Sequence, residues 1–313
     1  MISAPDIAAI RAAAEILATQ VRRTPMVPAE HDKARLEGRV LLKLECLQVT
    51  GSFKPRGALN TLRSLKPEEV RRGIITASGG NHGLAVAYAG YVAGAPATIY
   101  LPTSAPKSKV EKLRAWGAEV VVEGAVWDEA NRAALGAAER RGLTYIHPFA
   151  DPRVIAGQGT LGLEILEQAP EIDTLLVAIG GGGLIAGIAL AAKAVRPKIK
   201  VIGIEPTGAP TLYESLKARK LVELARIETV AGTLAPRMSA TLNLEIIGKH
   251  VDEIMLVSDE EMRTAARWLW FEHGVAAELS GAASLALLLS GRYRPRTGET
   301  VCVLVCGAGT DGL

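Results

Sequence analysis

Short apolar runs and longer amphipathic segments alternate along most of the chain. Between Gly73 and residue 146, runs such as Ile74–Ala77 (IITA) and Ala97–Leu101 (ATIYL) are each followed by a segment with helical spacing. Strands that alternate with helices in this way predict a parallel sheet with right-handed crossovers. A break falls at 147–153, where two prolines forbid one continuous element.

The same pattern gives bounds for the individual elements. Ser3 is expected to cap the first helix, with Asp6 at the capping-box position. Residues 205–243 have weak periodicity, and no element is assigned there. The predicted strands are 39–44, 74–77, 97–101, 119–122, 144–146, 174–179, 200–204, 253–257 and 300–305. The further predicted helices are 56–65, 83–93, 108–116, 128–141, 159–168, 184–195, 259–273 and one after Ser280.

Composition excludes several classes of protein. The chain has 313 residues, 49% of them hydrophobic, a length at which one core tends to divide into two. Its 36 basic and 33 acidic residues are nearly balanced and form no basic tract, so nucleic acid is not an expected partner. Cys46, Cys302 and Cys306 lack metal-ligand spacing and are odd in number, which favours a reducing cytoplasm over a disulfide framework. We expect no targeting segment and no membrane span, because the uncharged stretches 83–102 and 174–192 are both interrupted by turn residues.

The segment 50–60 (TGSFKPRGALN) contains a candidate reactive amine. Lys54 lies between Phe53 and small residues, and a lysine that acts as an amine needs a desolvated neighbourhood that lowers its pKa. The ordinary alternative is a solvated lysine before a helix. Only partners elsewhere in the chain can decide between these interpretations.

Four consecutive glycines, Gly180, Gly181, Gly182 and Gly183, join a buried-type strand to an uncharged helix that begins near Leu184. Backbone donors at such a turn, together with the positive end of the helix dipole, favour phosphate binding over a simple tight turn. Gly181, Gly183 and Ala186 also satisfy G-x-G-x-x-A, with Glu205 at the end of the next strand, so an NAD-dependent oxidoreductase is the rival interpretation.

A second glycine-rich loop, 78–83 (SGGNHG), again follows a predicted strand and precedes a helix. Ser78 and Asn81 suit capping, and Gly79 and its neighbour allow amides to converge on a carboxylate, whereas His82 by itself is more often structural. Cys306 would stand at the carboxyl edge of the last strand, where ligands bind in open α/β folds, although a buried inert thiol is the common alternative. Pyridoxal phosphate bound through Lys54 fits these four features together. Lys54 supplies an amine, the loop at Gly180 a phosphate site, the loop at Ser78 a carboxylate site, and Cys306 a group that would face the ring.

These motifs resemble those of the fold type II pyridoxal-phosphate enzymes, in the threonine/serine dehydratase and serine racemase-like branch. The resemblance runs from RTP (23–25) through LKLECLQVTGSFKPRGALN (42–60), SGGNHG, HPFADPRVIAGQGTLGLEIL (147–166), GGGGLIAGIA (180–189) and IEP (204–206) to CGAG (306–309). It implies an α/β fold of the tryptophan synthase β type, with two domains that each contain a twisted, mostly parallel sheet flanked by helices. The expected large, cofactor-binding domain is 1–72 with 151–313, and the small, substrate-carboxylate domain is 73–150.

The resemblance also implies roles for single residues. Lys54 would hold the cofactor as a Schiff base and move the α-proton, and Ser78 is the second candidate catalytic residue. The implied cofactor-binding residues are Phe53, Lys54, Asn81, Gly180, Gly181, Gly182, Gly183, Leu184 and Cys306. The implied substrate-binding residues are Ser78, Gly79, Asn81 and His82. The expected activity is an ammonia-lyase that converts L-threonine, L-serine or a related 3-hydroxy amino acid to a 2-keto acid, in a cytoplasmic homo-oligomer; a cofactor-bound amino-acid sensor is the non-catalytic alternative.

Departures from the family pattern bear on the substrate and on a metal. Racemases of this branch have a serine on the opposite face of the cofactor, where this chain has Gly79, so racemisation is the less favoured alternative. The family's divalent-cation site begins at Glu205, but a later acidic ligand is replaced by Thr211, so a metal stays undecided. A family ADG appears as Val230-Ala231-Gly232, a less polar wall that would admit a bulkier substrate. No regulatory domain is expected after Leu313.

Overall fold

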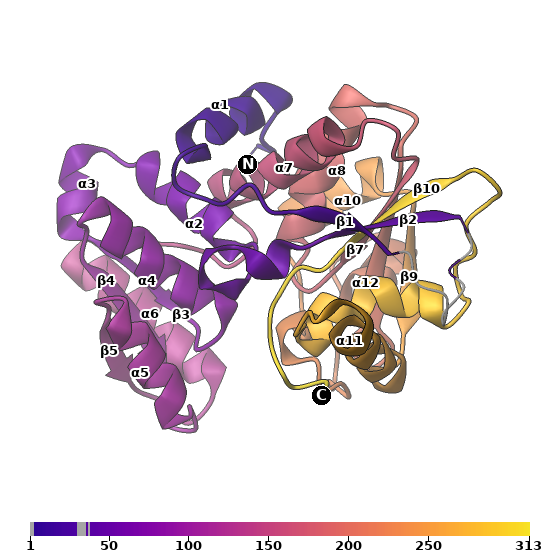
Figure 1. Cartoon of the computed structure of the whole chain (residues 1–313). Coiled ribbons are helices and arrows are strands. Elements are labelled where there is room, and N and C mark those ends of the chain that lie inside the picture. The colour runs from indigo at the N-terminus through magenta and orange to yellow at the C-terminus, as the bar shows by residue number, and fades with distance from the viewer. Residues whose placement is uncertain (1–2, 30–35, 37) are drawn as a thin grey trace.

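A computed structural model describes residues 3–29, 36 and 38–313, which form two sheets flanked by helices (Figure 1). The first sheet has the strand order β1-β2-β10-β7-β8-β9. Its edge strand β1 is antiparallel to β2, and all its other pairings are parallel. The strands are β1 (Met26–Pro28), β2 (Arg39–Lys43), β7 (Thr174–Ala178), β8 (Lys200–Pro206), β9 (Glu253–Val257) and β10 (Thr300–Leu304).

The second sheet is entirely parallel, with the order β5-β4-β3-β6. Its strands are β3 (Ile74–Ala77), β4 (Ala97–Leu101), β5 (Glu119–Val122) and β6 (Thr144–Tyr145), connected by α4 (Asn81–Ala93), α5 (Lys107–Ala115) and α6 (Trp127–Arg141). The predicted α/β class with two mostly parallel sheets is therefore confirmed. Strands β3, β4, β5 and β9 have the predicted bounds, because β-branched runs between turn residues define them locally.

The remaining helices pack mainly around the first sheet. Figure 1 shows α7 and α8 on one side of that sheet and α11 and α12 on the other. Short 3₁₀ turns lie at η1 (Glu45–Leu47), η2 (Val49–Gly51) and η3 (Gly232–Leu234). The helices are α1 (Ile7–Leu17), α2 (Lys54–Arg63), α3 (Pro67–Arg72), α7 (Pro152–Gln168), α8 (Gly183–Val195), α9 (Thr211–Ala218), α10 (Thr241–His250), α11 (Asp259–His273) and α12 (Leu279–Leu289).

Helix α2 joins the two halves of the molecule. Its buried residues Ala58, Leu59 and Leu62 belong to the hydrophobic cluster of the second sheet, while its polar side chains reach α7. The largest hydrophobic cluster surrounds the first sheet and includes strands β7, β8 and β10. The proposed division into 1–72 with 151–313 and 73–150 stays a prediction, and the packing of α2 shows that its side chains serve both cores.

Two local predictions were wrong, and one segment without a prediction contains a helix. The cap of α1 is Asp6, whose carboxylate accepts a hydrogen bond from the Ala9 amide (2.8 Å), and Ser3 lies outside the helix. Helix α7 begins at Pro152 and not at 159, because proline in the first helical turn removes no intrahelical hydrogen bond. The segment 205–243, to which no element was assigned, contains α9 and the first turn of α10.

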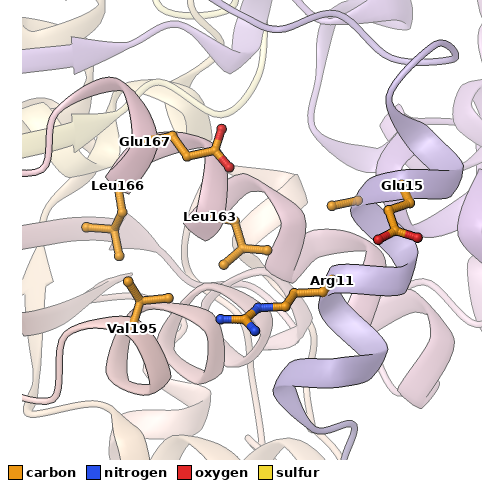
Figure 2. Close-up of a pocket in the computed structure, with 7 residues that line it drawn as sticks. Arg11, Glu15, Leu163, Leu166, Glu167 and Val195 are labelled. Atoms are coloured by element: carbon orange, nitrogen blue, oxygen red, sulfur yellow. The ribbon is translucent and has the colours of Figure 1, made fainter.

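A groove of about 420 Å³ lies between α1 and α7 (Figure 2). The groove is lined by Arg11, Ala14, Glu15, Leu163, Leu166, Glu167 and Val195. None of these lining residues belongs to the predicted site.

Among the described residues, no helix is both long and apolar enough to cross a membrane.

The cap of α1 gives a stability prediction. Asp6→Ala removes the acceptor of the Ala9 amide, so the free energy of unfolding should fall by about 1 kcal/mol, as for other N-cap losses. Ser3→Ala is the control and should leave the stability unchanged. Urea unfolding followed by circular dichroism measures both, and equal midpoints for the two variants would contradict the assignment of the cap.

Candidate active site

Lys54 is the first residue of α2 and lies where β10 ends. The Phe53 amide donates to the Cys306 carbonyl (3.3 Å), and Ser52 pairs with Gly307 in an antiparallel bridge. Pro55 lies in the first turn of α2, where its missing N–H costs no hydrogen bond. The chain before α2 is thus tied to the carboxyl edge of the first sheet, and Lys54 is held there.

The Lys54 amine is half-buried among groups that leave it little charge stabilisation. Its Nζ donates to the Pro148 carbonyl (2.8 Å) and lies 5.0 Å from the centre of the Phe53 ring. Burial lowers the pKa of Lys54 to about 8, while Cys306 and Glu278 act in the opposite direction. A substantial fraction of this amine is therefore unprotonated near neutral pH, which the ordinary solvated alternative would not give.

The loop after β3 presents the amino end of α4. The N-cap is Gly80, and no side chain of the described residues caps this helix. The Ser78 hydroxyl accepts from the Gly80 amide (3.3 Å), and a Cβ at Gly83 would lie 1.9 Å from the Ser78 carbonyl oxygen, so only glycine fits there. Free amides and the helix dipole together make this end suited to a carboxylate.

Asn81 and His82 differ in what they can offer a ligand. The Asn81 side-chain amide donates to the Glu278 carboxylate (2.8 Å), a contact between α4 and the start of α12. His82 is buried, and its Nε2 lies 2.9 Å from the Ile146 carbonyl. Burial lowers the pKa of His82 to about 3, with the Lys54 cation acting in the same direction, so the ring is neutral and points to the backbone that follows β6.

The loop Gly180–Leu184 occupies the equivalent position after β7. Gly182 has φ +90°, a conformation that favours glycine, and no side chain in the described part of the chain caps α8. The Asn243 side-chain amide holds the loop by donating to the Gly181 carbonyl (2.6 Å). The first amides of α8 therefore form a second cradle for an anion, linked to the first through Thr233, which lies against Gly180 and donates to Glu278 (3.3 Å), the partner of Asn81.

The glycines of this loop are also required by close packing. A Cβ at Gly181 would lie 2.2 Å from the Phe149 ring, and one at Gly183 would lie 2.5 Å from the Phe149 carbonyl oxygen. A Cβ at Gly180 would approach the Thr233 carbonyl oxygen to 2.7 Å. Sequence reasoning treated 147–153 as a break and as part of a family motif, without a role at the site, but its Pro148 carbonyl contacts Lys54 and its Phe149 ring covers the glycine loop. The two prolines in HPFADPR were the sequence feature that could have pointed to a rigid segment at the site.

Cys306 follows β10 and is a neutral thiol. It is 3% exposed, its Sγ donates to the Ser280 carbonyl (3.7 Å), and burial raises its pKa above the usual range. Glu278 lies against Gly307, where an added Cβ would come within 2.3 Å of the carboxylate. Burial raises the pKa of Glu278 to about 7. Sequence reasoning placed Glu278 only at the start of a family motif, which appears here as ELSGA (278–282), and gave it no role.

Glu205 has a structural partner that sequence reasoning did not foresee. It is fully buried, and its carboxylate oxygens accept from the amides of Leu212 (2.9 Å) and Tyr213 (2.8 Å) in the first turn of α9. Burial raises its pKa to about 8. The described residues contain no group of three or more His, Cys, Asp or Glu side chains that could hold a metal. Glu205 is therefore committed to α9 and offers no carboxylate oxygen to a nicotinamide ribose.

Comparisons with known proteins agree with this arrangement. The L-threonine ammonia-lyase of Geobacter sulfurreducens is 43% identical over 298 residues, which cover 95% of this chain and 74% of the relative. Maize serine racemase has a similar structure, with a TM-score of 0.93 and 37% identity, covering 97% of this chain and 94% of the other. The processed form of threonine deaminase isoform 2 from Solanum lycopersicum has a TM-score of 0.91 at 35% identity, covering 99% of this chain and 87% of the other. The model of the family "Pyridoxal-phosphate dependent enzyme" matches residues 17–307, so this chain belongs to that family.

Proposed function

We propose that this protein is a pyridoxal-phosphate-dependent ammonia-lyase that converts L-threonine, L-serine or a related 3-hydroxy amino acid to a 2-keto acid and ammonia. The observation that carries the proposal is the half-buried Lys54 amine with its lowered pKa. It donates to Pro148, whose neighbour Phe149 covers the glycine loop before α8, and its charge acts on His82 in the first turn of α4. Relatives named L-threonine ammonia-lyase support the reaction type.

The residues present fit this cofactor. Lys54 supplies the amine for the aldehyde, and the loop Gly180–Leu184 with the amino end of α8 supplies amides for the phosphate. Phe53 lies beside Lys54, where it can pack against a ring. When bound, pyridoxal phosphate withdraws electrons from the α-carbon of an amino acid and so makes its α-proton acidic.

The remaining groups orient the substrate and move protons. The amides of the loop that contains Ser78 and Gly79 bind the substrate carboxylate at the start of α4, next to Asn81 and His82. The Lys54 amine takes the α-proton, for which a pKa of about 8 is suitable near neutral pH. Cys306, as a neutral thiol, carries no negative charge that would stabilise a protonated ring nitrogen, and this favours β-elimination over transamination.

Racemisation is the second candidate activity, because rice serine racemase is 36% identical over 98% of this chain. It requires an acid on the face of the α-carbon opposite Lys54. Gly79 has no side chain to provide one, so we infer that racemisation is the minor reaction. The homo-oligomeric state, the cytoplasmic location and a divalent-cation requirement stay predictions from the resemblance.

Removal of the amine tests the proposed function. Lys54→Ala should abolish both the visible absorption band of bound cofactor and 2-keto-acid release, because it removes the group that would bind the aldehyde. Lys198→Ala, at an exposed position, is the control and should keep both. The assay is a panel of 3-hydroxy amino acids with and without chelator. Retention of the band and of turnover in Lys54→Ala would sink the proposal.

The lowered pKa of Lys54 predicts early titration in the cofactor-free protein. Because the folded-state pKa is lowered to about 8, the neutral amine should appear as the pH rises through 8, whereas an unfolded-state lysine titrates near about 10.4. Labelling with an amine reagent across a pH series, followed by peptide mass spectrometry, gives the midpoint. The urea-unfolded protein is the control, and equal midpoints in the two states would contradict the desolvated amine.

A serine at residue 79 tests the assignment of the second face. Gly79→Ser should raise the ratio of racemisation to elimination, because it supplies the missing acid. Its Cβ would lie 3.1 Å from the Leu101 Cδ2, so that flexible side chain must shift by a few tenths of an ångström. Gly80→Ser places a hydroxyl one residue away in open space and is the comparison. Chiral chromatography of the remaining substrate measures the ratio, and no difference between the variants would refute the assignment.

A further inference from the structure

Lys54 and Arg56 contact opposite sides of the first turn of α2. Each residue turns an α-helix by roughly 100°, so side chains two positions apart point in nearly opposite directions. Lys54 contacts the Pro148 carbonyl at the candidate active site, whereas Arg56 contacts Glu45 and Glu164 on the other side. The turn that carries the reactive amine is thus held from behind by Arg56.

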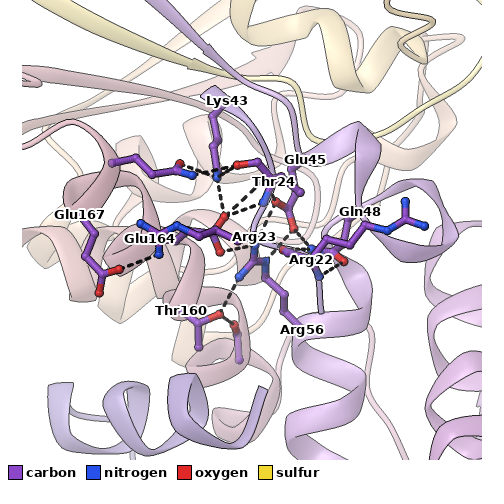
Figure 3. Close-up of polar contacts among 12 residues, drawn as sticks. Arg22, Arg23, Thr24, Lys43, Glu45, Gln48, Arg56, Thr160, Glu164 and Glu167 are labelled. Carbon is purple, nitrogen blue, oxygen red and sulfur yellow. Dashed lines mark hydrogen bonds and ion pairs between the residues drawn. The ribbon is translucent and has the colours of Figure 1, made fainter. Parts of the chain in front are cut away.

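Arg56 makes a forked, fully buried set of contacts (Figure 3). Its Nε and Nη2 donate to the two carboxylate oxygens of Glu45, at 2.6 and 3.1 Å. Nη2 also donates to Glu164 (2.8 Å) and Nη1 to the Thr160 hydroxyl (3.2 Å), both on α7. The planar guanidinium therefore fixes α2 in direction as well as distance, which a lysine ammonium at the same place could not do.

The contacts of Arg56 are balanced in charge by Lys43. Lys43 is fully buried on β2 and forms an ion pair with Glu164, and its Nζ also donates to the Thr24 carbonyl (2.7 Å). Two cations and two carboxylates thus neutralise each other between β2, α2 and α7. Buried ion pairs of this kind add little net stability compared with apolar packing, but they specify one geometry, because any displacement leaves a charge unpaired.

Backbone packing and a side-chain hydrogen bond also hold α2 against α7, since the Asn60 amide donates to the Arg153 carbonyl (2.7 Å). A Cβ at Gly157 would lie 2.4 Å from the Arg56 carbonyl oxygen, and one at Gly57 would lie 2.8 Å from the Val154 Cγ1. The helices therefore touch at their backbones there. No side chain of the described residues caps the start of α2. In this first turn, the Arg56 fork adds the charged contacts that orient the helix against Glu45 and α7.

We propose that Arg56 is a positioning residue for Lys54, and that its fork with Glu45 and Glu164 sets the direction in which the Lys54 amine enters the active site. This inference rests on the proposed function of Lys54. Arg56 acts through orientation and not through charge, because the groups that shift the Lys54 pKa are its burial, Cys306 and Glu278. Misplacement of a reacting group by about 1 Å is enough to lower a rate roughly 100-fold.

The test compares two swaps of one cation for another in the holoenzyme. Arg56→Lys keeps the buried charge and removes the fork. Lys193→Arg is the matched control, since Lys193 pairs with Asp252 (2.8 Å) at the far end of α8. Arg56→Lys should lower kcat by roughly 100-fold per bound cofactor with little change in KM. Lys193→Arg should leave both constants unchanged.

A second variant guards against loss of folding. Arg56→Met with Glu45→Gln removes one cation and one anion and leaves the Lys43–Glu164 pair neutral, so the fork is lost without an uncompensated charge. It should show the same loss of kcat. In the cofactor-free proteins, labelling of Lys54 at pH 8 should be about tenfold faster than in the wild type, because the amine loses its hydrogen bond to Pro148. The pH midpoint should be unchanged, because the amine stays in the same buried site.

The outcomes separate the positioning role from the proposed function. Wild-type kcat per bound cofactor in Arg56→Lys, with only a lower melting temperature, would show a purely structural role and overturn the inference. A shifted pH midpoint of Lys54 labelling would overturn the claim that Arg56 acts through orientation alone. If the wild type itself binds no cofactor, the proposed function fails, and an unchanged Lys54 labelling rate in the Arg56 variants then overturns the positioning role as well.

Discussion

The structure depends on a set of four charges buried where β2, α2 and α7 meet. Arg56 and Lys43 face Glu45 and Glu164, and none of the four could be buried alone without a large desolvation penalty. Glu164 lies 108 positions after Arg56 and 121 positions after Lys43, so its ion pairs form only when both helices and the strand are correctly placed. The network therefore couples the packing of the first sheet to the orientation of the helix that begins with Lys54.

The site itself is built from backbone as much as from side chains. Strand β3 of the second sheet and β7 of the first sheet are each followed by a glycine-rich loop and a helix that begins with free amides. Glycines are required at these turns because neighbouring backbone and the Phe149 ring leave no room for a Cβ. The same close packing that excludes side chains brings amide donors toward an anionic ligand.

Burial sets the protonation of the groups around Lys54. It lowers the pKa of the amine to about 8 and keeps Cys306 as a thiol and His82 as a neutral ring. Glu278, with its pKa raised to about 7, changes charge near neutrality, and it holds Asn81 through a hydrogen bond. In such a site the amine loses its proton more readily than a solvated lysine, while helix dipoles still attract an anionic ligand.

The sequence by itself determined which segments are helices and which are strands over most of the chain. It also determined the two glycine loops, the candidate lysine and the family. All of these depend on spacing and on residue type within short windows. Strands β3, β4, β5 and β9 followed from such spacing alone. The tertiary structure decided the partners of buried polar atoms: Glu205 caps α9, and Asn81 reaches Glu278 across 197 positions. It also showed that Asp6, not Ser3, caps α1. A buried polar atom must find its partner among whatever residues the fold brings near, and no local pattern records that choice.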